Sequence, residues 1–121
     1  MPVLSPVRVI RYVRPRLENY CFSNLGGVTF VFTLDYNLRT VEVQTAICSS
    51  KDNFNKADGL KYALESSPRK FNLDKFQAFA DEEGGFVHAY IAVLKSEAVS
   101  EAVLPSEKVL LRKMADQRLI P

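Results

Sequence analysis

The sequence predicts a single α+β domain, in which a hairpin-based antiparallel β-sheet comes first and α-helices follow. Two periodicities predict it: apolar residues recur every second position up to about residue 48, and every third or fourth position from about residue 49. The length agrees, because 121 residues with 47% apolar content are enough for one hydrophobic core. We therefore expect one domain over 1–121, with the antiparallel sheet in 1–48 and a mainly helical part in 49–121.

Three runs of residues predict the strands. The first run, 7–13, alternates valines with arginines and ends before Pro15, which lacks a backbone donor. The second run, 27–34, alternates aromatic or aliphatic residues with threonines, and the third run, 38–47, again alternates apolar with polar residues. A short polar turn at 35–37 joins these two runs, so they should form an antiparallel hairpin.

Helical spacing begins after the third run. Ser49, three residues before Asp52, resembles a helix N-cap with acidic support and predicts a helix over about 51–65. A second helix should begin at residue 72 or 73 and end at the Gly84-Gly85 pair.

The last part of the sequence is less clear-cut. The segment 86–103 fits a helix by its apolar spacing, and its local alternation also fits a strand; a helix is our expectation. Pro105 then breaks the chain, and Ser106 caps a final amphipathic helix.

Charge and hydropathy limit the classes of function. The formal net charge of +2 is too small to indicate a nucleic-acid-binding protein, although residues 1–20 hold four arginines against one glutamate. No apolar window is long enough for a membrane span, and prolines and arginines interrupt the amino-terminal segment. Cys21 and Cys48 have apolar neighbours, which is typical of buried reduced thiols. We expect a cytoplasmic protein that does not contact a membrane.

The residues that most enzyme chemistry needs are missing. His88 is the only histidine and lies among apolar residues, as a core or boundary histidine does, so no serine or cysteine can be paired with a base. One histidine and two distant cysteines lack metal-ligand spacing, and the carboxylates at 81–83 are typical of a solvated turn. No glycine-rich phosphate loop opens a helix. We expect no enzyme activity, no metal and no cofactor.

The sequence does offer groups that bind a phosphorylated ligand. Cationic side chains hold phosphates, and aromatic faces stack on bases with about 1–3 kcal/mol per base. Each candidate also has an ordinary structural interpretation, since Phe54 fits a core position and the arginines of 7–16 fit a charged edge strand. The candidates for phosphate are Arg8, Arg14, Arg16, Arg69 and Lys70. The candidates for base and ribose are Phe54, Tyr62 and Phe71, together with Asn53 and Asn72.

The stretch 26–64 joins the predicted hairpin to the first helix through Cys48-Ser49, an Asp-x-Phe-x-Lys motif at 52–56, and Gly59. This stretch resembles small phage-encoded proteins of the first Thoeris anti-defence family. The resemblance covers about residues 26–64, and Leu60 stands where the family leads us to expect a basic residue. It implies an amino-terminal antiparallel sheet followed by helices.

The resemblance also implies a function. Such a protein acts in the host cytoplasm as a sponge that binds cyclic nucleotide immune signals, such as cyclised ADP-ribose isomers and cyclic oligonucleotides, without cleaving them. It further implies a homo-oligomer, such as a hexamer, with ligand pockets between subunits, which lets a small chain surround a charged ligand.

Two other functions remain open from the sequence. A small inhibitor protein could bind a host enzyme or immune complex by protein–protein contact. A single-stranded nucleic-acid-binding protein could use the arginine strand with Tyr12 and Tyr20 as stacking faces, and its affinity would then fall steeply with salt.

Overall fold

The computed structural model describes residues 5–14 and 25–97. The strands in these ranges form one antiparallel sheet in the order β1-β2-β3-β4, so each strand pairs with the next one along the chain. The predicted α+β class with its amino-terminal antiparallel sheet is confirmed. The elements are β1 (Val7–Val13), β2 (Leu25–Asp35), β3 (Thr40–Asn53), α1 (Lys56–Glu65), β4 (Arg69–Asn72), α2 (Leu73–Glu83) and α3 (Phe86–Glu97).

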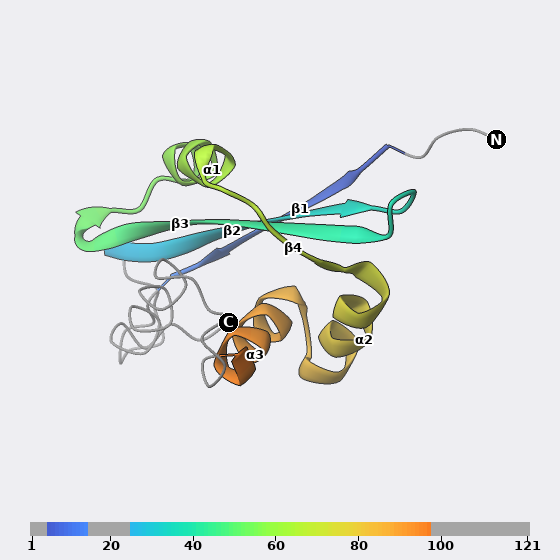
Figure 1. The fold of residues 1–121 in the computed structure, drawn as a ribbon. Coiled ribbons are helices and arrows are strands. Elements are labelled where there is room, and N and C mark those ends of the chain that lie inside the picture. Colours follow the sequence, from blue (N-terminus) through green and yellow to red (C-terminus); the bar gives the residue numbers. More distant parts are fainter. Residues whose placement is uncertain (1–4, 15–24, 98–121) are drawn as a thin grey trace.

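Helices cover both faces of the sheet. Figure 1 shows α1 on one side of the strands and α2 with α3 on the other. Strand β2 explains this arrangement, because alternate side chains of a strand point to opposite faces. Phe30 and Phe32 join the core formed with α2 and α3, whereas Thr29 and Val31 are fully buried toward the face that α1 covers.

Aromatic rings dominate the core between the sheet and the pair α2–α3. The Phe32 ring lies 5.4 Å from the ring of Phe86 and 6.0 Å from that of Phe76, and Phe30 meets Tyr90 edge to face at 6.2 Å. Such pairs contribute about 0.5–1.5 kcal/mol beyond the burial of their area. Truncating Phe32 to alanine would lower the free energy of unfolding by about 3–5 kcal/mol. Packing on this side of the sheet therefore contributes much of the stability of the fold.

Helix α1 begins at Lys56, and the predicted start near residue 51 is wrong. Strand β3 continues to Asn53, where it pairs with Leu25 after a register shift in which four residues of β3 stand against one of β2. The cap is Asn55, whose side-chain oxygen accepts a 3.0 Å hydrogen bond from the backbone of Asp58. Pairing with a strand distant in sequence thus overrides the local capping signal at Ser49.

The sheet also extends beyond residue 48, through the end of β3 and through β4, which the sequence did not predict. Strand β4 has only four residues and places Phe71 opposite Val41. Helix α2 follows at once and ends as predicted, because Gly84 takes a left-handed φ of 95° and donates its N–H to the Ala80 carbonyl at 2.9 Å.

The expectation of a helix after Gly85 is confirmed over Phe86–Glu97. The helix predicted after Ser106 lies outside the described residues. Within 5–14 and 25–97, no helix is long and apolar enough to cross a membrane.

Candidate functional site

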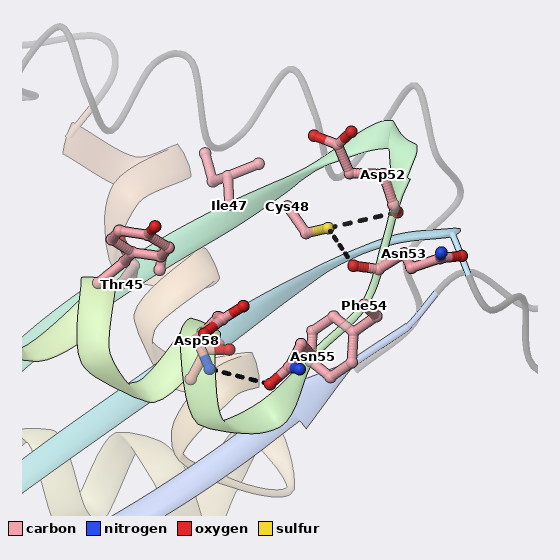
Figure 2. Close-up of a pocket in the computed structure, with 12 residues that line it drawn as sticks. Thr45, Ile47, Cys48, Asp52, Asn53, Phe54, Asn55 and Asp58 are labelled. Atoms are coloured by element: carbon pink, nitrogen blue, oxygen red, sulfur yellow. Dashed lines mark hydrogen bonds between the residues drawn. The ribbon is translucent and has the colours of Figure 1, made fainter.

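A cavity of about 520 Å³ lies between β3 and α1, and β2 contributes Thr29 to its lining (Figure 2). Its volume falls in the range of about 300–1,000 Å³ that is usual for small-molecule sites. The lining comes from three parts of the chain: one residue of β2, the end of β3 with the connection to α1, and the first turns of α1. The lining residues are Thr29, Thr45, Ala46, Ile47, Cys48, Asp52, Asn53, Phe54, Asn55, Asp58, Gly59 and Tyr62.

Gly59 sets the distance between α1 and the sheet. A Cβ atom built on Gly59 would overlap Thr29 Oγ1, so only a residue without a side chain lets the helix backbone come this close. Ala63 is the one buried residue of α1. Small residues therefore carry the contact between helix and sheet, and the cavity opens beside it.

The connection from β3 to α1 fixes the position of Phe54. Cys48 Sγ donates to the carbonyls of Asp52 at 3.5 Å and Asn53 at 3.7 Å, which ties the turn to the strand. The half-buried Phe54 ring then lies on Gly27, where a Cβ would come within 2.7 Å of Phe54 Cδ2. With a φ of 122°, Gly27 also has a backbone conformation that other residues rarely adopt. Phe54 thus stands as a fixed wall of the cavity.

The cavity is rich in hydrogen-bond acceptors. Asp52 and Asp58 contribute carboxylates, and Figure 2 shows Asp58 reaching from α1 toward the cavity. None of the described lining residues is a lysine, arginine or histidine. Thr29 Oγ1 is buried and has no hydrogen-bond partner among the described residues. Such a lining suits a neutral group that brings donors, for example ribose hydroxyls or the amino group of a base, better than a phosphate.

Two cations, one directly after β1 and one at the start of α1, lie close to Phe54 and Tyr12. The Arg14 guanidinium carbon lies 5.3 Å from the centre of the Phe54 ring, and Lys56 Nζ lies 5.1 Å from that of Tyr12. The two rings meet edge to face at 5.9 Å. Arg14, Tyr12 and Lys56 line a second, smaller cavity of about 340 Å³ together with Ile10 and Arg11. Phe54 therefore lines the acceptor-rich cavity and also contacts Arg14, which lines the cationic one.

The structure brings part of the predicted site together. Asn53, Phe54 and Tyr62 line the larger cavity, and the Arg14 guanidinium lies over the Phe54 ring. Arg8 is exposed on β1 and lines neither cavity, and Arg16 lies outside the described residues.

The four candidates of β4 lie elsewhere and have structural partners. Phe71 packs against the core rings of Phe76 and Tyr90, and Asn72 caps α2 by accepting from the Lys75 backbone at 3.0 Å. Lys70 Nζ lies 3.6 Å from a Glu42 carboxylate oxygen. The Arg69 guanidinium lies 5.5 Å from the ring centre of Phe71. The structure therefore does not join these residues to the site.

Sequence reasoning missed Thr29, Asp58 and Gly59. Gly59 carried a usable signal, because a glycine inside a helix costs about 1 kcal/mol relative to alanine and so points to a close approach. Thr29 and Asp58 carried none, since only the packing of α1 on β2 brings them to the cavity.

The described residues hold no group of three or more histidine, cysteine or acidic side chains that could bind a metal ion. His88 is half-buried in α3 and lines neither cavity. The chain matches no protein-family model, no curated protein and no solved structure.

Proposed function

We propose that the protein binds and sequesters a small nucleotide signal of the cyclic ADP-ribose or cyclic oligonucleotide class and leaves it uncleaved. The observation that carries the proposal is the cavity between β3 and α1, lined by Asn53, Phe54 and Tyr62, of which Phe54 also contacts the Arg14 guanidinium. Ligands of this class join neutral bases and riboses to phosphates, and the site offers partners for both kinds of group.

The neutral part of such a ligand fits the larger cavity. The rings of Phe54 and Tyr62 offer faces for a base, and the Asp58 carboxylate accepts hydrogen bonds from ribose hydroxyls, as acidic residues do in dinucleotide sites. The negative phosphates would avoid Asp52 and Asp58 and turn toward Arg14.

A protein that sequesters a signal needs high affinity for it and needs no catalytic residues. A signal that acts at micromolar concentration is depleted by a binder with a nanomolar Kd, which corresponds to about −12 kcal/mol. An ordered cavity with a fixed aromatic wall lowers the entropic cost of reaching such an affinity. Assembly into a homo-oligomer belongs to the same proposal, because subunits that share a ligand add contacts to it.

Calorimetric titration with cyclic ADP-ribose isomers and with cyclic di- and trinucleotides tests the proposal. We expect saturable binding to at least one ligand, and chromatography should recover that ligand unchanged after the protein is denatured. Native mass spectrometry of the same sample reports the subunit number. Absence of heat with every ligand, or recovery of a cleaved product, would refute the proposal.

Tyr62→Ala and Tyr36→Ala form a matched pair for this titration. Both tyrosines are exposed, at 59% and 45%, so neither change should unfold the protein. Tyr62 lines the cavity, whereas Tyr36 lies in the turn between β2 and β3. We expect Tyr62→Ala to weaken binding by about five- to one-hundred-fold, the equivalent of one stacked base, and Tyr36→Ala to leave it unchanged.

A further inference from the structure

We propose that the cavity on the β1 side of Phe54 is an anion site that takes phosphate groups, with Arg14 and Lys56 as its cations. The identity of the whole ligand rests on the proposed function, whereas the anion chemistry rests on this cavity alone. The cavity measures about 340 Å³, and three of its five lining residues are cationic.

The charges of Arg14 and Lys56 are not neutralised within the described part of the chain. Ion pairs there join Arg39 to Asp74 and Lys70 to Glu42, away from this cavity. Among the described residues, Arg14 and Lys56 contact two aromatic rings and no carboxylate, whereas Arg11 also lines a cavity at α2 that includes Asp81. Two positive charges that lie close together without a carboxylate repel each other in the free protein. Binding of an anionic ligand relieves this repulsion, so the arrangement favours such a ligand.

Aromatic rings hold two of the cations in place. Lys56 Nζ stands 5.1 Å from the centre of the Tyr12 ring and the Arg14 guanidinium 5.3 Å from that of Phe54. Cation–π contacts at exposed sites are modest, yet they restrict long side chains that would otherwise sample many rotamers. A guanidinium on a ring face keeps its N–H donors at its edge, where they can bind two phosphate oxygens at once. The donors are thus positioned before the ligand arrives.

The larger cavity explains why phosphate belongs on this side of Phe54. Its lining carries Asp52 and Asp58 and no described cation, so a phosphate placed there would meet repulsion. A ligand that contacts both sides would place its neutral part in the larger cavity and its phosphate over Arg14 and Lys56. The basic residues of β4 do not compete for this role, since Lys70 faces Glu42.

The test uses the full chain and inorganic pyrophosphate, titrated by calorimetry and by ³¹P line broadening. We expect Arg14→Gln and Lys56→Gln each to weaken pyrophosphate binding by about tenfold. Lys75→Gln is the matched control, because it removes the same charge from the exposed surface of α2 and should change nothing. Thermal melts of each variant confirm folding, and Arg14→Lys should retain part of the affinity because it keeps the charge.

The outcomes separate this inference from the proposed function. Pyrophosphate that binds equally to wild type, Arg14→Gln and Lys56→Gln overturns the anion site. Pyrophosphate that binds through these residues while every cyclic nucleotide fails supports the anion site and refutes the nucleotide sponge. A single-stranded oligonucleotide that binds far more tightly than pyrophosphate, with steep salt dependence, overturns the assignment to a small ligand.

Discussion

A methyl group at position 59 tests how α1 rests on the sheet. A Cβ at Gly59 would overlap Thr29 Oγ1, and Thr29 lies in a strand held between two neighbours, so the strand cannot easily retreat. Gly59→Ala gains about 1 kcal/mol of helix propensity but adds an overpacking cost of about 1–3 kcal/mol. We expect a net loss of about 1 kcal/mol, which for a domain of this size lowers Tm by about 3–5 °C.

Urea unfolding of a double-mutant cycle measures this contact. Thr29→Ala removes the hydroxyl that the new methyl would meet, so the double variant should be more stable than the two single effects predict, by about 1–2 kcal/mol. Gly84→Ala serves as the control, because a Cβ there meets nothing within 4 Å and its cost comes from a φ of 95° alone. Additivity between positions 29 and 59, or a stabilised Gly59→Ala, would show that α1 does not approach the sheet as closely as described.

Three further changes test individual contacts. Thr29→Val replaces a buried hydroxyl without a described partner by a methyl group, and urea unfolding should show a gain of about 1 kcal/mol; a loss would reveal a hydrogen bond. Asp35→Ala removes the carboxylate oxygen that accepts from the Asn37 and Leu38 amides at 2.9 Å, and we expect a loss of about 1–2 kcal/mol in the same assay. The hydrogen bond from Arg39 lowers the pKa of Asp74 below its ordinary value, so this carboxylate stabilises the fold above the ordinary pKa and loses the effect as the pH falls through the lowered pKa. The Tm difference between wild type and Asp74→Asn should therefore be fully present near pH 7 and shrink as the pH falls through the lowered pKa of Asp74. A difference that stays constant throughout an acid titration would contradict this reasoning.

The fold was predictable where local pattern and tertiary structure agree. The alternation of Phe30 and Phe32 with Thr29 and Val31 is imposed by the strand itself, so it predicted both the strand and its two faces. The start of α1 was not predictable, because Ser49 is a good local cap and only the distant pairing of Leu25 with the end of β3 overrides it. Local chemistry does not reveal such a pairing.

The candidate site could be anticipated in residue type but only partly in location. Asn53, Phe54 and Tyr62 were chosen because amides and rings suit a nucleotide, and all three line the cavity. Phe71 and Asn72 have the same side-chain chemistry, yet one packs into the core and the other caps α2. Their positions in β4 explain the different roles. Phe71 lies opposite Val41 of β3, whereas Asn72 lies directly before the first residue of α2.

Phe54 forms a wall of the larger cavity and the support for Arg14, so one substitution at this position should affect both cavities. Phe54→Leu keeps an apolar side chain on Gly27 but removes the face that holds the guanidinium and the edge contact with Tyr12. We expect it to weaken the binding of both adenosine and pyrophosphate by about fivefold or more, whereas Tyr62→Ala should weaken only adenosine and Arg14→Gln only pyrophosphate. Calorimetry with the two probes on the three variants measures this pattern. If Phe54→Leu impaired one probe and spared the other, the two cavities would be independent sites and no single ligand would need to span the ring.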